Sequence, residues 1–360
     1  MTAQGGRSFV GAFGLVLCVM AGLFVFDVFL AKVEREETGS RAAQLAGAGA
    51  RLLAAGDGPG AVKKLEEAVA EERTNREYRR RLAEAQLAAG RAGDAAGELE
   101  SLLQGDSMDG MANLLLGRVL VRQGRLEEGI SYFHRAVYGR WGKDAAAKRL
   151  AARFELIELL AGTGMKADLL AELLAVQDQV SSVEERLRLG GLFLAADAPG
   201  RALELYRGIL RDDPENLEAR EGWGKAEFAR GNYRVAAREL RAVVEQGRTG
   251  PGVAQMLATL DALFAEDPTV RGLGPEEKLR RSRAVLEQTA KAVGGCAAEG
   301  ALLQDAAQRV SGRVPAGRQL AAAEGDLDLA ERLWQTAKRD CHPVPGVDAP
   351  LGIILGRLAQ

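Results

Sequence analysis

The feature that most constrains this chain is an internal repeat with a period of about 34 residues. Small residues stand at Ala61, Ala95, Gly129, Ala167, Ala202 and Ala236. A glycine or an aspartate precedes each of them by five positions, at Gly56, Gly90, Gly124, Gly162, Asp197 and Gly231. Another apolar residue follows each by seven positions, at Ala68, Leu102, Ala136, Leu174, Ile209 and Val243. Three sets of positions that keep one period predict a fold made of stacked copies of one small unit.

Each unit is predicted to be two α-helices joined by a tight turn. The glycine or aspartate favours the left-handed backbone conformation in which a helix commonly ends. The small residue that follows lets the second helix cross the first closely, and the apolar positions beyond it lie on the same helical face. Apolar residues make up 47% of the chain but aromatic residues only 5%, which suits close packing of helices. We therefore predict an all-α fold.

The fifth and sixth units are the most regular. Residues 183–216 carry Leu189, Gly190, Ala202, Tyr206, Ile209, Asp213 and Pro214, and residues 217–250 carry Gly224, Gly231, Tyr233, Ala236 and Val243. With these residues at these offsets the chain resembles the tetratricopeptide repeat family. The resemblance implies a right-handed superhelix, an α-solenoid, with units at about 42–75, 76–109, 110–143, 148–181, 183–216 and 217–250. The fourth unit follows a four-residue insertion around 143–147.

Beyond residue 250 the period breaks, and a divergent helical region is expected over 251–360. Helices are predicted at 251–264, 275–293 and 299–310. A degenerate seventh unit is expected near 311–344, because Gly325, Ala330, Trp334 and Ala337 match the repeat offsets. Residues 351–358 could then form the terminal helix that covers the last apolar face of the array.

The first 41 residues divide into a short tail (1–8), an apolar segment (9–31) and a linker (32–41). The apolar segment has 23 residues and one charge, Asp27, and as a helix it would be long enough to cross a bilayer. We therefore expect an uncleaved transmembrane signal-anchor helix, and a single-pass protein of a bacterial-type inner membrane. Lys and Arg alone favour a cytoplasmic body, whereas net flanking charge favours an exported one. A periplasmic body is the expectation, and a ridge of Gly14, Cys18 and Gly22 could pair two such helices in a homodimer.

The motifs of common enzyme classes are absent. The sequence has no G-x-S-x-G, H-E-x-x-H, P-loop or C-x-x-C motif. Two histidines and three cysteines leave little for metal chemistry, and a net charge of −2 gives no bulk attraction for nucleic acid. We therefore expect no metal, no cofactor and no nucleic-acid partner. Cys296 and Cys341 could form a disulfide in an oxidising compartment, and Cys341 with His342 is the basis of the less favoured alternative, an enzyme that uses region 251–360.

In proteins that resemble this family, the first helix of each unit lines a concave groove that binds partner segments. Carried over to this chain, those positions are Arg80, Glu84, Leu87, Leu114, Arg118, Val121, Arg122, Leu156, Leu159, Leu160, Leu194, Glu221, Lys225 and Phe228. The resemblance thus implies a non-catalytic, membrane-anchored scaffold for protein partners in envelope assembly, secretion or polysaccharide export. The alternative is an anchored, cytoplasm-facing regulator of an inner-membrane synthase.

Overall fold

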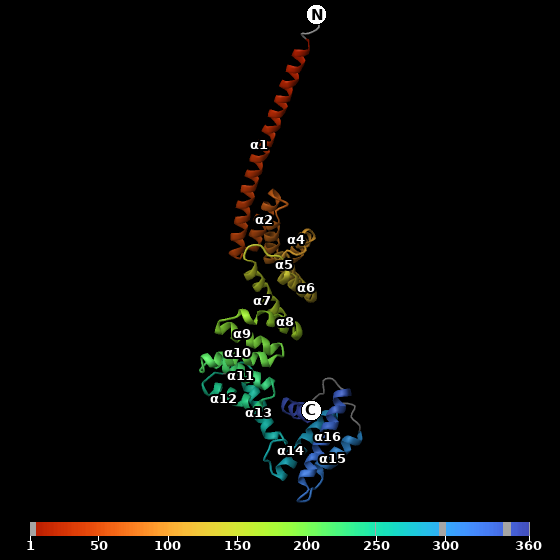
Figure 1. Ribbon diagram of the computed structural model, residues 1–360. Coiled ribbons are helices and arrows are strands. Elements are labelled where there is room, and N and C mark those ends of the chain that lie inside the picture. Colours follow the sequence, from red (N-terminus) through yellow and green to blue (C-terminus); the bar gives the residue numbers. More distant parts are fainter. Residues whose placement is uncertain (1–4, 249, 295–299, 341–346, 360) are drawn as a thin grey trace. The chain divides into compact units, whose positions relative to one another are not determined.

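The computed structural model describes residues 5–248, 250–294, 300–340 and 347–359, with the side chains of 5–19, 21 and 22 left out. In this described part every regular element is a helix, and no strand occurs beyond one isolated β-bridge (Figure 1). The all-α prediction is thus confirmed. The chain divides into two compact units, residues 1–176 and 177–360, which are described separately here as unit 1 and unit 2.

In unit 1 consecutive helices pair as hairpins, and each hairpin packs against the next. Its helices are α1 (Gly5–Ala54), α2 (Gly58–Glu71), α3 (Arg76–Ala88), α4 (Ala92–Gly105), α5 (Gly110–Arg122), α6 (Leu126–Tyr138), α7 (Ala145–Thr163) and α8 (Lys166–Val176).

Unit 2 begins with a short 3-10 turn, η1, and continues with helical hairpins before the repeat pattern is lost. Its helices are η1 (Gln177–Gln179), α9 (Val183–Ala195), α10 (Pro199–Asp212), α11 (Leu217–Ala229), α12 (Tyr233–Glu245), α13 (Val253–Glu266), α14 (Pro275–Val293), α15 (Gly300–Ser311), α16 (Gln319–Asp340) and α17 (Ala349–Leu358).

Five of the six repeat turns have the predicted left-handed residue, with positive φ at Gly56, Gly90, Gly124, Asp197 and Gly231. Four of the small residues that follow them, Ala61, Ala95, Ala202 and Ala236, have no exposed surface. At the fifth, Gly129, an added Cβ would lie 3.2 Å from the Gly117 carbonyl oxygen, so α5 and α6 cross closely there.

The fourth unit departs from the predicted register by two residues. Its left-handed residue is Gly164 rather than Gly162, because α7 is 19 residues long and delays the turn. The buried position five residues later is Leu169, only 1% exposed, and Val176, seven residues beyond it, is fully buried. The predicted packing residue Ala167 is instead exposed, and Leu174 is 39% exposed.

A buried carboxylate ties the last three helices of unit 1 together. The Glu172 side chain on α8 is 6% exposed and forms ion pairs with Arg153 on α7 and His134 on α6. The Nε atom of Arg153 lies 3.0 Å from Glu172 Oε2, and Nδ1 of His134 lies 3.5 Å from Oε1. Hydrogen bonding to Glu172 raises the pKa of His134 above its usual value, despite the opposing effect of burial. His134 therefore links α6 to α8 through Glu172.

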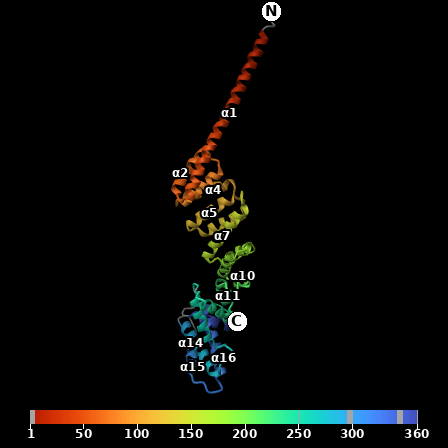
Figure 2. The same cartoon turned by 90° about the vertical axis from the view of Figure 1, so that its left-hand side faces the viewer.

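The N-terminal helix is longer than predicted. Figures 1 and 2 show α1 as one continuous helix that extends well beyond α2. Its packed part begins near Ala42, which is fully buried, whereas large apolar side chains between Met20 and Val33 are exposed. From Leu23 onward the apolar run meets Asp27 and then the charged residues that follow Ala31.

This helix corrects the prediction of a membrane span. Over the described residues, no helix is both long enough and apolar enough to cross a membrane. The predicted single-pass inner-membrane protein, with residues 9–31 as its transmembrane signal anchor, is therefore wrong.

The C-terminal part of unit 2 is helical as predicted, but the degenerate seventh repeat is not a helical hairpin. Gly325 lies inside α16, a single helix of 22 residues, instead of in a turn. Ala330 is fully buried, and it packs in the cluster that α16 forms with α14 and α17. The cap predicted at 351–358 is present as α17, which contacts α13 and α14.

In unit 2 one aromatic ring fixes the spacing of three helices. Tyr206 of α10 is 4% exposed and lies between Gly190 of α9 and Gly222 of α11. A Cβ added at Gly190 would lie 2.6 Å from Cζ of this ring, and one added at Gly222 would lie 2.7 Å from Cε2 and closer still to two other ring atoms. Both glycines are therefore required because the ring occupies the space of a side chain at each.

Candidate functional site

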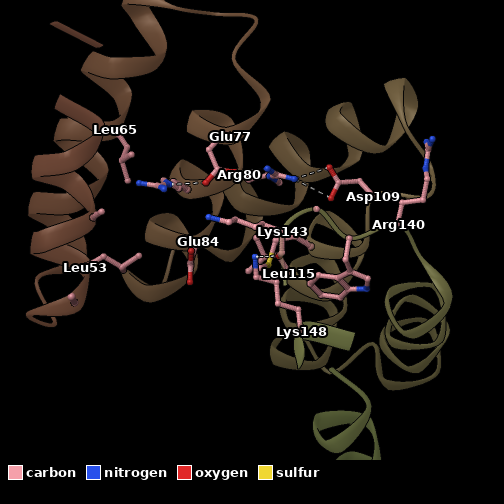
Figure 3. A pocket seen from close by; sticks show the side chains of 16 residues that line it. Leu53, Leu65, Glu77, Arg80, Glu84, Asp109, Leu115, Arg140, Lys143 and Lys148 are labelled. Atoms are coloured by element: carbon pink, nitrogen blue, oxygen red, sulfur yellow. Dashed lines mark hydrogen bonds and ion pairs between the residues drawn. The ribbon is translucent and has the colours of Figure 1, made fainter. Parts of the chain in front are cut away.

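The candidate site is a groove of about 790 Å³ on unit 1. It is lined by α1, α2, α3, α5 and the start of α7, together with the segment that joins α6 to α7 (Figure 3). Its apolar lining consists of Ala50, Leu53, Ala54, Met111 and Trp141, together with Leu65 and Leu115, which are at most 1% exposed. Its charged lining consists of Glu77, Arg80, Arg81, Glu84, Asp109, Arg140, Lys143 and Lys148. The site is thus amphipathic, with apolar contacts and charged groups in one groove.

The segment 139–144 forms one wall of this groove and is held by the backbone. The Arg140 amide donates to the Met108 carbonyl at 2.6 Å, and the Gly110 amide donates to the Arg140 carbonyl at 2.8 Å. The Trp141 indole packs over Gly110, where an added Cβ would lie 2.5 Å from the ring, and its Nε1 donates to the Ala136 carbonyl at 2.8 Å. Residues 140 and 141, just before the insertion that breaks the repeat period, are therefore fixed against the start of α5 and the end of α6.

Next to this segment lies a network of ion pairs around Asp109, whose side chain is 8% exposed. Arg80 of α3 donates from its guanidinium to Asp109 Oδ2 at 3.1 Å, and Asp109 also accepts from the Ala112 amide as the N-cap of α5. Arg80 and Arg81 both bind Glu77. Although burial acts in the other direction, these hydrogen bonds lower the pKa of Glu77, so its carboxylate stays charged. Glu77 and Asp109 are thus neutralised within the protein.

Two lysines differ from the arginines in having no such partner. In the described part of the chain, no carboxylate forms an ion pair with Lys143 or Lys148, and both side chains are exposed. The Lys148 Nζ donates to the Lys143 carbonyl at 2.9 Å, which keeps the two residues together (Figure 3). They are cations at the groove that the protein itself does not neutralise. Sequence reasoning missed both, although the break in period at 143–147 marks the place.

The structure divides the predicted groove residues of unit 1 into three groups. Arg80 and Glu84 line the groove. Leu87, Leu114, Leu156 and Leu160 are core residues with at most 6% exposure, Leu159 is half-buried, and Val121 packs at the α5–α6 crossing. In this chain those core positions taken over from the family face the adjacent helix.

The remaining two predicted residues of unit 1 are engaged with the chain itself. Arg118 binds Glu155 of α7 through two nitrogens, with Nε 2.8 Å from Oε2. Arg122 donates to the Leu87 carbonyl at 2.6 Å. Neither lines the groove.

The predicted groove residues of unit 2 also contact one another. Glu221 has a side chain 7% exposed, and it binds Lys225 Nζ at 2.6 Å and Arg248 Nε at 3.1 Å. Phe228 packs edge-on against Tyr233 with the ring centroids 5.5 Å apart, and Leu194 is half-buried. The charges of this surface are therefore satisfied internally, in contrast to the lysines of unit 1.

Several predicted features lie outside the described residues. Cys296, Cys341 and His342, which carry the disulfide and enzyme hypotheses, are among them. Gly14, Cys18 and Gly22 lie in α1, but their side chains belong to the part left out. Among the residues that are described, no group of three His, Cys, Asp or Glu side chains could hold a metal ion.

Comparison with known proteins gives one family match. The model of the tetratricopeptide repeat family matches residues 52–119 and 193–260. No curated protein matches the sequence.

Similar solved structures are all distant. They include YrrB, a TPR protein with an unusual peptide-binding site (18% identity, 53% of this chain and 96% of that one, TM-score 0.42). They also include a thermophilic TPR protein from Thermus thermophilus (20%, 52% and 99%, TM-score 0.33) and a tetratricopeptide repeat protein from Parabacteroides merdae (13%, 89% and 98%, TM-score 0.32). The two stretches that match the family model fall one in each unit, so each unit contains a stretch similar to the tetratricopeptide repeat.

Proposed function

We propose that this protein is a non-catalytic scaffold whose unit 1 groove binds a peptide segment of a protein partner. Tetratricopeptide repeats suggest a protein-interaction scaffold, and the groove is the observation that carries the proposal for this chain. Its volume of about 790 Å³ falls in the range of ligand sites, and its mixed apolar and charged lining suits an amphipathic peptide. The proposal is limited to binding, because nothing in the comparisons supports a role in envelope assembly, secretion or polysaccharide export, or in control of a synthase.

The groove offers a peptide two kinds of contact. The side chains of Met111 and Trp141 are half-buried, so their remaining surface can still be removed from water by a partner. The ordered 139–144 wall and the hairpins on either side mean that little of the site has to be ordered on binding. A preformed groove loses less conformational entropy when a partner binds, which favours affinity.

Two methionines provide the test. Met111 lines the groove, whereas Met108 is 46% exposed but lies outside it. A fluorescein-labelled pool of mixed peptides about ten residues long should bind the full chain in an anisotropy titration. Met111→Arg should abolish this binding, and Met108→Arg should leave it unchanged. Equal binding by the two variants, or no saturable binding by the unmodified protein, would refute the proposal.

A further inference from the structure

We infer that the segment bound in the unit 1 groove is acidic, with carboxylates that face Lys143 and Lys148. This inference rests on the proposed function and specifies the chemistry of the partner. It comes from the charges that remain after the internal ion pairs of the groove are accounted for.

The arginines of the groove are already used. Arg80 and Arg81 are held by Glu77 and Asp109, and Arg140 binds Asp106 at 2.5 Å. Lys143 and Lys148 remain as cations without a carboxylate partner in the described chain. Figure 3 shows both side chains among the residues that line the groove. A carboxylate of a bound partner could therefore form an ion pair with either ammonium group without displacing a carboxylate of the described chain.

The backbone holds the lysines where a partner would find them. Lys148 lies in the first turn of α7 and its Nζ is fixed to the Lys143 carbonyl, while the 139–144 segment is tied to residues 108 and 110. The backbone positions of the two lysines are therefore set by the fold. Two cations side by side at one part of the groove are complementary to a partner of opposite charge.

Glu84 is expected to oppose the effect of the two lysines on binding of an acidic peptide. It lines the same groove on α3, is exposed, and forms no ion pair within 4.0 Å in the described chain. An acidic peptide would be repelled by Glu84 and attracted by the lysines. Removing Glu84 should thus strengthen binding of such a peptide, whereas removing the lysines should weaken it.

A peptide is favoured over a polyanion by the rest of the lining. Leu53, Met111 and Trp141 give the groove an apolar part that a phosphate backbone would not use. The chain as a whole has a net charge of −2, so it has no general attraction for nucleic acid. The partner chemistry that fits both features is an extended segment in which acidic and apolar residues alternate.

The test uses three labelled peptide pools with the same apolar residues and with Glu, Gln or Lys at alternate positions. For the full chain, the Glu pool should bind about tenfold more tightly than the Gln pool, and the Lys pool should bind least. The variant Lys143→Gln/Lys148→Gln should remove the preference for Glu over Gln. Lys63→Gln/Lys291→Gln, which makes the same charge change at exposed lysines outside the groove, should keep it. Glu84→Gln should increase affinity for the Glu pool.

The other outcomes separate the two proposals. If the Gln pool binds as tightly as the Glu pool but Met111→Arg abolishes both, the groove binds peptides and the acidic preference is wrong. If no pool binds, the peptide site is wrong as well. If a single-stranded oligonucleotide displaces the Glu pool as efficiently as unlabelled Glu peptide does, the lysines recognise polyanions in general, and the inference of an acidic peptide partner is overturned.

Discussion

Replacing Gly222 by alanine should destabilise unit 2, although alanine is the better helix former. The added Cβ would lie 2.7 Å from Cε2 of Tyr206 and closer still to Cζ and Cε1, whereas atoms in good contact are about 3.5–4.0 Å apart. The ring cannot move away, because Gly190 of a second helix, α9, also lies against it, with an added Cβ 2.6 Å from Cζ. The helices α9, α10 and α11 would therefore have to separate.

The magnitude follows from two opposing contributions. Overpacking of a core costs about 1–3 kcal/mol, and a ring confined from both sides should be near the upper end of that range. Replacing a glycine inside a helix by alanine stabilises the helix by about 1 kcal/mol. The net loss of unfolding free energy for Gly222→Ala should therefore be about 2 kcal/mol.

Gly191 gives a matched control. It lies in α9 directly after Gly190, and no atom is within 4 Å of a Cβ added there. Gly191→Ala should therefore raise the free energy of unfolding by about 0.5–1 kcal/mol. Urea denaturation followed by circular dichroism measures both variants. In a Tyr206→Leu background the loss caused by Gly222→Ala should largely disappear. If Gly222→Ala is as stable as Gly191→Ala, the ring does not fix the spacing of these helices.

Three further predictions concern unit 1. Glu172 raises the pKa of His134, so the stabilisation that protonated His134 contributes is fully present below its unfolded-state pKa and is lost as pH rises through its folded-state pKa. The difference in urea midpoint between the unmodified protein and His134→Gln should therefore shrink from pH 5.5 to pH 8. A constant difference would contradict this. Leu169→Ala should lower the free energy of unfolding by about 2–5 kcal/mol, because Leu169 is buried. Ala167→Leu should change it by less than about 0.5 kcal/mol, because Ala167 is exposed. If thermal melts show a larger loss of melting temperature for Ala167→Leu than for Leu169→Ala, the register predicted from sequence is the correct one. Arg118→Glu should lower stability by up to about 1 kcal/mol through loss of the Glu155 pair, and adding Glu155→Arg should recover it; absence of recovery in the double-mutant cycle would show that the pair contributes nothing.

The repeat architecture could be predicted from sequence because each of its determinants is local. A glycine with positive φ and a small residue five positions later act within one helical hairpin, so their spacing is visible without the rest of the fold. The fourth unit shows the limit of this reasoning. Gly162 and Gly164 can both end a helix, and only the length of α7 decides that Gly164 does. The exposed Ala167 and buried Leu169 follow from that choice.

The site was less accessible to sequence reasoning. The groove positions taken from the family place Leu87 and Leu156 against neighbouring helices, since whether an apolar residue faces a core or a groove depends on the helix packed next to it. The two lysines without a carboxylate partner, Lys143 and Lys148, lie in the insertion and directly after it, where the repeat period does not predict which residues line a groove. The single helix α16 was missed for a related reason, because Gly325 can lie within a helix as well as at its end.

The bridge between residues 109 and 140 also determines how the chain responds to a pulling force. It joins the entrance and the exit of the α5–α6 hairpin through two backbone hydrogen bonds, and the two segments run parallel. Tension along the chain would draw the first segment backwards and the second forwards, so both bonds would be loaded in shear at the same time. The hairpin between them would carry no load until the bridge breaks. In unit 1 this bridge therefore acts as a mechanical clamp, and single-molecule stretching should release the α5–α6 pair in one late step.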